Sequence, residues 1–378
     1  MALITYLARV HFADGVLEDA LWSELEARRR KRPLFVVKRE GLVADTIERL
    51  FASLPVRTGA IAHDDVPPVP THRHALKLAR AFRDEGCDAL VAFGSAAAIN
   101  LAKLARLALA LDDGLTGGLS RAADGGGRLE PGTALPDLIA IPGIGGFGAA
   151  LSADTPMLLD GVATTVRSRE IIPRVTICDP TLTLDATVEE TAAAAAEAVG
   201  QCMEAFLSRG YNPPAEGIAL DGLRRAMRHW ERVLRNERDL EARREMMAAS
   251  LNGALAVQKG LGASHASSAA LGSVSDRALS SGTLKRITLP EVLRYNREAA
   301  VEKFRVLETM LDLTNREADE GVERVFATMP LPTKLSELGL SALQLERAAV
   351  VAAEDMASGT NPRAMDAGDY LSLMRSLH

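Results

Sequence analysis

The feature of this sequence that most constrains its fold is a change of pattern at Asp179-Pro180. Before this pair, short apolar runs alternate with amphipathic helical patterns and glycine-rich turns. After it, apolar residues recur at helical spacing almost to the end of the chain. We therefore expect an α/β domain over residues 1–180 and an all-helical bundle domain over residues 181–378.

Five short apolar runs in the first domain have the length and composition of buried parallel strands. Helical patterns separate most of them, so the order favours a doubly wound, Rossmann-like sheet with helices on both faces. Such sheets bind ligands beyond the carboxyl ends of their strands. The five runs are Val10–Phe12, Leu34–Val37, Ala89–Phe93, Leu138–Ile141 and Val175–Cys178.

The composition narrows the class of partner. A net charge of −6 argues against nucleic acid or an anionic membrane surface, because neither attracts an acidic protein without a strong basic patch. Cys87, Cys178 and Cys202 share no metal-binding spacing, and they suit a reducing compartment better than a disulfide framework. The start of the chain is unlike a signal peptide, and no apolar run is long enough to span a membrane. We expect a cytoplasmic protein that acts on a small molecule.

The segment Asp179–Ser208 reads DPTLTLDATVEETAAAAAEAVGQCMEAFLS. It resembles the signature helix of the iron-containing alcohol dehydrogenases and the related maleylacetate reductases, in which a DP-x-LT turn precedes an Asp and a His four residues apart. Those two side chains bind the divalent metal in the dehydrogenases. The matching positions here are Glu197 and Gln201, which share one helix face. Without the resemblance, the same pair also suits a solvated or interhelical polar face.

Other segments have counterparts in the same family and in the same order. DALVAFGSAAAINLAK resembles the strand, glycine turn and helix that hold the cofactor diphosphate, and LIAIPGIGGFGAALS resembles a second cofactor segment. ARREMMAASLNGALAVQKGLGASHASSAALG resembles the helix pair that carries another metal-binding His. The chain is identified as a member of this superfamily, closest to the maleylacetate reductases, which already depart from the dehydrogenases in the signature helix. The resemblance implies a dehydroquinate synthase-like fold. It also implies a homodimer, because dimers are common in the family.

The first of the two cofactor segments differs from the family pattern. Gly94-Ser95-Ala96-Ala97 stands where the family has three glycines and a serine, and each added Cβ hinders the close approach of a diphosphate. Lys38-Arg39-Glu40 follows the second strand, where a basic residue is able to accept a 2′-phosphate, although an exposed basic turn explains it equally. We expect weak binding of NADPH or NADH. The residues implied in cofactor binding are Gly94, Ser95, Ala96, Ala97, Gly145, Gly146 and Arg39.

The metal positions are degenerate as well. The matching set is Glu197, Gln201, His265 and Ser281, and Ala269 replaces a further His. One imidazole and one carboxylate make a poor site for Fe²⁺ or Zn²⁺. We therefore expect no bound metal.

The resemblance implies a metal-independent, NAD(P)H-linked reductase of the maleylacetate reductase type that acts on a small oxo-carboxylate. In this hypothesis His265 polarises the carbonyl group as a general acid, and Lys285 or Arg286 holds the substrate carboxylate. A packing role for His265 is the alternative from the residues alone. Two other functions stay open: a scaffold reused for a hydrolase or lyase step on an acidic metabolite, and a non-catalytic partner subunit.

Overall fold

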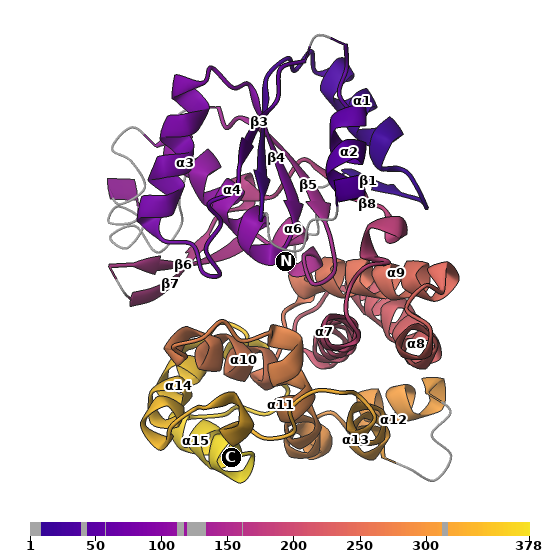
Figure 1. The fold of residues 1–378 in the computed structure, drawn as a ribbon. Helices are drawn as coiled ribbons and strands as arrows, with labels where there is room; N and C mark the ends of the chain where they lie inside the picture. Colours follow the sequence, from indigo (N-terminus) through magenta and orange to yellow (C-terminus); the bar gives the residue numbers. More distant parts are fainter. Residues whose placement is uncertain are drawn as a thin grey trace. The chain divides into compact units, whose positions relative to one another are not determined.

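The computed structural model describes residues 9–38, 44–56, 58–111, 117–118, 134–160, 162–311 and 317–378. The chain forms two compact units, Tyr6–Leu184 and Asp185–His378 (Figure 1). The first contains a parallel sheet with helices, and the described part of the second is helical throughout. The predicted combination of a Rossmann-like domain and a helical domain is therefore confirmed. None of the helices in the described ranges combines the length and the apolar character needed to cross a membrane.

A six-stranded sheet organises the first unit, in the order β1-β8-β5-β4-β2-β3. Every pairing in this sheet is parallel. The central strands β4 and β5 run in register from Ala89 opposite Asp137 to Gly94 opposite Pro142, so the turns that follow them are neighbours. The strands are β1 (Arg9–Phe12), β2 (Pro33–Val37), β3 (Ile61–His63), β4 (Ala89–Gly94), β5 (Asp137–Pro142) and β8 (Val175–Cys178).

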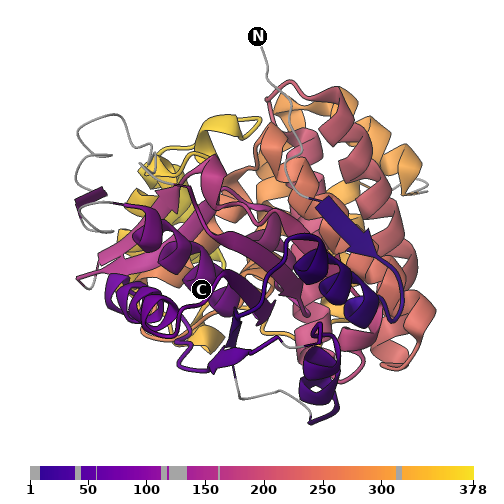
Figure 2. The same ribbon diagram turned by 90° about the horizontal axis from the view of Figure 1, so that it is seen from above.

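Alternate side chains of the strands pack against helices on opposite faces of the sheet, because successive side chains of a strand point to opposite sides. Leu90 and Ala92 of β4 join one hydrophobic cluster with α3 and α4, whereas Val91 and Phe93 join a second with α1 and α2. Helices therefore cover both faces of the sheet, as Figure 1 and Figure 2 show. The helices are α1 (Leu17–Ala27), α2 (Ala44–Ala52), α3 (His72–Asp84), α4 (Ala96–Ala110) and the short α6 (Phe147–Leu151).

Three strands lie outside the predicted runs. The edge strand β3 is only three residues long and half exposed, so it has no apolar run to reveal it. β6 (Asp154–Leu159) and β7 (Val162–Arg167) form a separate antiparallel hairpin. Polar and apolar residues mix along this hairpin, and its pattern is weaker than that of the buried central strands.

Asp179, the residue at the change of pattern, is completely buried and ties three segments together. Its Oδ1 accepts hydrogen bonds from the backbone N–H of Gly15 at 2.8 Å and of Thr181 at 3.0 Å. Its Oδ2 accepts from Leu17 N at 3.2 Å and from the Arg49 guanidinium at 3.0 Å. The DP turn of the sequence therefore fixes the end of β8 against the β1–α1 turn and α2.

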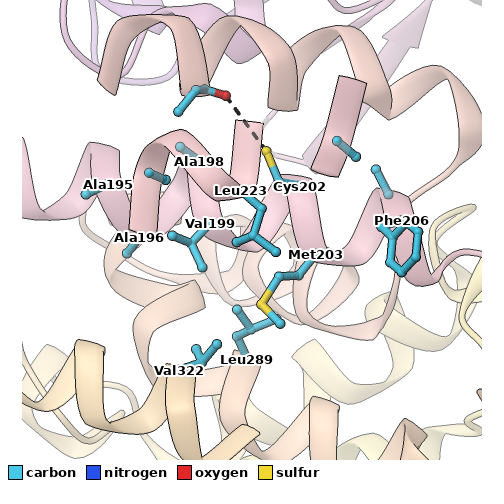
Figure 3. Close-up of a cluster of buried hydrophobic side chains, with 14 of the residues drawn as sticks. Ala195, Ala196, Ala198, Val199, Cys202, Met203, Phe206, Leu223, Leu289 and Val322 are labelled. Atoms are coloured by element: carbon cyan, nitrogen blue, oxygen red, sulfur yellow. Dashed lines mark hydrogen bonds between the residues drawn. The ribbon is translucent and has the colours of Figure 1, made fainter. Parts of the chain in front are cut away.

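The second unit is built around α7 (Val188–Leu207), which begins at a capping box formed by Thr187 and Glu190. Its alanine-rich faces pack against α8, α9 and α11. Figure 3 shows the apolar side chains of α7, among them Val199 and Met203, gathered with Leu223 of α8 and Leu289 of α11. The other helices are α8 (Pro213–Arg235), α9 (Leu240–Ala256), α10 (Ala263–Val274), α11 (Ser281–Asn296), α12 (Val301–Met310), α13 (Ala318–Ala327), α14 (Ala342–Glu354) and α15 (Ala367–Ser376).

Candidate active site

In the α/β unit, the candidate cofactor site is the turn between β4 and α4. Gly94 ends the strand with a φ of +88°, a conformation that favours glycine. Ser95 then caps α4, because its Oγ accepts a hydrogen bond from Ala98 N at 3.3 Å. The N–H groups of Ala96 and Ala97 belong to the first turn of this helix, where no intrahelical acceptor is available. The turn thus presents the positive end of a 15-residue helix to an anion.

The space in front of this turn is open, and the next turn supports it. A Cβ added at Gly94 would meet no atom within 4 Å. Gly143 N donates to Gly94 O at 2.9 Å, and a Cβ on Gly146 would lie 2.5 Å from the same oxygen. Gly145 is exposed and has a φ of +76°. The two turns therefore interlock through their glycines, and this arrangement fits the diphosphate of a dinucleotide.

Ala96 and Ala97 obstruct this turn less than their sequence positions suggest. Both side chains contact the hydrophobic cluster that lies between α4 and the sheet. The predicted basic contact cannot be located in the same way, because Arg39 lies outside the described residues. Its neighbour Lys38 directly follows β2.

In the helical unit, three helices bring together five of the predicted side chains. Glu197 and Gln201 come from α7, His265 from α10, and Ser281 and Lys285 from α11. The Lys285 ammonium donates to Glu197 Oε1 at 3.0 Å, and Gln201 Nε2 donates to the same oxygen at 2.7 Å. The Lys285 side chain is fully buried, whereas that of Glu197 is 23% exposed. The centre of this cluster is an ion pair.

The ion pair controls the charge of Glu197. Burial by itself raises the pKa of this carboxyl group. The Lys285 ammonium, the Ser281 hydroxyl and the His265 ring together outweigh burial, so the pKa is lowered overall. Glu197 is consequently ionised at neutral pH.

Two glycines make room for this arrangement. A Cβ on Gly200 of α7 would lie 2.6 Å from Lys285 Cδ, so the lysine stem runs across the bare backbone at this position. A Cβ on Gly282 of α11 would lie 1.8 Å from Ala193 O of α7. Glycine at both positions lets α11 approach α7 closely enough for Lys285 to reach Glu197. The signal in the sequence is that Gly200 interrupts an alanine-rich helix.

His265 is held in the first turn of α10 by a network that the sequence motifs did not reveal. Glu204 Oε1 accepts hydrogen bonds from Ser264 N at 2.8 Å and from His265 N at 3.0 Å. Asn361 Oδ1 accepts from Ala263 N at 3.0 Å. Because the N-cap residue of α10 is a glycine without a side chain, these distant oxygens replace the usual cap. They fix the backbone from which His265 projects.

Glu204 gives this unit a testable pH dependence. Burial raises the pKa of its carboxyl group from 4.5 to about 7, despite the opposing Lys285 ammonium and the two backbone hydrogen bonds. As the pH rises from about 4.5 through about 7, the folded state must release a proton that the unfolded state has already lost, so stability falls.

Glu204→Gln keeps an acceptor for both N–H groups but cannot ionise. Between about pH 5 and pH 8, we expect the free energy of unfolding of the wild type to fall by on the order of 2 kcal/mol relative to that of this variant. Urea unfolding followed by circular dichroism at both pH values measures the difference. Equal pH dependence in the two proteins would contradict the ionisation of Glu204.

Two predicted positions lie apart from the ion pair. Arg286 follows Lys285 on α11, but the carboxylates that act on it are Glu323 and Glu337. Ala269, which replaces a family His, is exposed one turn after His265 on the same helix face.

The cluster does not fit a divalent transition metal. Among the described residues, no group of three or more His, Cys, Asp or Glu side chains is placed to hold a metal ion. An amide and a hydroxyl are weak donors for Fe²⁺ or Zn²⁺, and an ammonium is none at all. The Glu197 carboxylate is therefore met by N–H donors from Gln201 and from the neighbouring Lys285 instead of by a cation's other ligands.

Comparison with known families decides the relationship. The model for iron-containing alcohol dehydrogenase matches residues 8–180, and the model for the Fe-containing alcohol dehydrogenase family, C-terminal, matches residues 191–378. This chain belongs to the iron-containing alcohol dehydrogenase family. The predicted superfamily is confirmed, and the chain is an oxidoreductase of this type.

The alignments with individual relatives cover most of the chain. It is 33% identical over 383 residues to a 4-hydroxybutyrate dehydrogenase of Cupriavidus necator, covering 99% of each protein. It is 25% identical over 322 residues to an NAD-dependent methanol dehydrogenase of Bacillus methanolicus, covering 82% of each. Among solved structures, a 1,3-propanediol oxidoreductase matches with a TM-score of 0.90 at 22% identity, covering 100% of both chains. The maleylacetate reductase from Agrobacterium tumefaciens matches with a TM-score of 0.80 at 22% identity, covering 100% and 98%. These two structures share the fold.

Proposed function

We propose that this protein is an NAD(P)-linked dehydrogenase that interconverts a small hydroxy-carboxylate and the corresponding oxo-carboxylate without a bound divalent metal. The observation that carries the proposal is the ion pair that Lys285 forms with Glu197, one of the four positions that match the family's metal ligands. The relative that covers 99% of the chain is a 4-hydroxybutyrate dehydrogenase, which supports a substrate with a carboxylate. The maleylacetate type of substrate, also an oxo-acid, belongs to the same chemical class.

The α/β unit supports the nicotinamide cofactor. The open turn at Gly94, the Ser95 hydroxyl and the first N–H groups of α4 would hold its diphosphate. The turn with Gly145 and Gly146 would lie beside it, after the neighbouring strand. When bound in its reduced form, the nicotinamide supplies a hydride to the carbonyl carbon of the substrate.

The helical unit supplies the proton in this proposal. His265 projects from the turn that Glu204 holds, and it donates a proton to the carbonyl oxygen as the oxygen becomes a hydroxyl group. In the oxidative direction the same ring accepts that proton. The Glu197 carboxylate, held by Lys285 and Gln201, interacts electrostatically with the His265 ring.

The direct test uses protein freed of metal by a chelator. We expect it to reduce 4-oxobutanoate with NADPH or NADH, and to turn over this substrate faster than an aldehyde without a carboxylate. Loss of activity after chelation, with recovery on adding Fe²⁺ or Zn²⁺, would contradict metal independence. No binding of either dinucleotide at about 1 mM would contradict the redox function and favour a hydrolase, a lyase or a non-catalytic subunit.

A matched pair of variants tests the cofactor turn. Gly94→Ala places a Cβ in the open space before the turn and strains a backbone with a φ of +88°. Gly86→Ala introduces comparable strain at a φ of +61°, in the turn after α3. We expect Gly94→Ala to weaken NADH binding about tenfold or more, and Gly86→Ala to leave it unchanged. Titration of nicotinamide fluorescence measures both, and equal affinities would contradict the assignment.

A further inference from the structure

The Lys285–Glu197 pair is built into the helical unit rather than resting on its surface. The Lys285 side chain has no exposed area, and its stem passes Gly200, where any Cβ would lie 2.6 Å from Cδ. A flexible surface lysine needs no such space. The packing of two helices therefore fixes one positive charge against Glu197.

Gln201 also directs a hydrogen-bond donor toward Glu197. Gln201 presents its Nε2 to Glu197 Oε1 at 2.7 Å. Its own Oε1 faces α9 instead, since a Cβ on Gly253 would lie 3.2 Å from that atom. Of the two α7 positions that match metal ligands, one is thus paired with an ammonium and the other acts as a donor. The pair is also electrically balanced, with one negative and one positive charge.

From this arrangement we infer that the Lys285 ammonium takes the place of the divalent cation and excludes it. The inference rests on the metal-independent function proposed above and gives it a physical cause. A divalent ion bound by Glu197 would lie within a few ångströms of a buried positive charge, and the repulsion between the two is large in a poorly solvated site. Lys285 is then a positioning residue that holds the Glu197 carboxylate, to which Gln201 also donates.

The test restores the lost ligands and asks whether the lysine still keeps metal out. Gln201→His with Ser281→His supplies two imidazoles next to Glu197 and His265. This double variant is made in the full chain with Lys285 retained, with Lys285→Ala and with Lys285→Met. Isothermal calorimetry with Zn²⁺ alone, and elemental analysis after dialysis, measure binding without reference to enzyme activity.

We expect weak zinc binding while Lys285 is present and an affinity about 100-fold higher once it is replaced. Arg305→Ala in the same background is the charge control, because Arg305 lies on α12 with a side chain 67% exposed and pairs only with the exposed Glu302 among the ion pairs of the described residues. It should leave the zinc affinity unchanged.

Three outcomes would overturn the inference. One is tight zinc binding with Lys285 still in place, which can be read even if neither replacement folds. The second is no gain on replacing Lys285, and the third is an equal gain from Arg305→Ala. Dehydrogenase activity of the metal-free wild type is measured separately, so failure of the proposed function and failure of this inference are distinguishable.

Discussion

Gly282→Ala is expected to lower the free energy of unfolding of the helical unit by about 3 kcal/mol or more. The added Cβ would lie 1.8 Å from Ala193 O and 2.6 Å from Ala193 C, and both are backbone atoms of α7. Backbone atoms cannot rotate away as a side chain does, so α11 and α7 must separate. Ser281 and Lys285 lie on either side of the substitution and would move away from Glu197 with α11.

Gly217→Ala is the control for this prediction. Gly217 is an exposed position in α8, and a Cβ there would meet no atom within 4 Å. Alanine is the better helix former, so this variant should be unchanged or more stable by roughly 0.5–1 kcal/mol. Denaturant unfolding followed by circular dichroism compares the two. If both variants matched the wild type, α11 would not lie as close to α7 as described.

The sequence was a good guide to the fold because the fold depends on patterns that repeat. Buried parallel strands such as β4 and β5 need continuous apolar runs, and these are visible without any structure. The break at Asp179-Pro180 was equally readable, although the role of Asp179 as a buried acceptor for Gly15 and Arg49 was not. Those contacts join positions more than a hundred residues apart, and no local pattern records them.

The sequence indicated that four of these side chains lie close together, but not how they interact. The family resemblance placed Glu197, Gln201, His265 and Ser281 together, and the structure brings them together. The sequence analysis also proposed Lys285 or Arg286 as the residue that binds the substrate carboxylate. In the structure, the ammonium of Lys285 is buried against Glu197. How deeply a lysine is buried depends on what it packs against, here Gly200 of another helix.

The supporting network shows the same limit. Glu204 lies three residues after Gln201 on α7, and it caps the helix that carries His265. Asn361 completes the cap and exchanges hydrogen bonds with Asn296 at 2.7 and 2.9 Å. These residues come from three separate segments of the chain. Their shared role is clear only from the structure, in which the N-terminus of α10 has no cap from its own N-cap residue.

The second large effect is expected at the ion pair itself. Lys285→Met keeps an apolar stem of similar length but removes the ammonium, and we expect it to lower the free energy of unfolding by about 3 kcal/mol. Glu197→Gln leaves the fully buried Lys285 without an anion and should cost a similar amount. The double variant has neither charge. Its loss of unfolding free energy should therefore be smaller, by about 2 kcal/mol, than the sum of the losses of the two single variants.

An exposed pair supplies the reference for this coupling. Arg305 and Glu302 are 67% and 83% exposed, and their coupling should be below about 1 kcal/mol because solvent screens both charges. The pH gives an independent check on the sign. The pKa of Glu197 is lowered in the folded protein, so its stabilising effect is present at neutral pH and is lost as the pH falls through that lowered value. In Lys285→Met burial is no longer opposed by the ammonium, so the loss of stability at acid pH that Glu197 contributes should shrink or reverse. A coupling no larger than that of the exposed pair, with an unchanged loss at acid pH, would mean that Lys285 fills space beside Glu197 without compensating its charge.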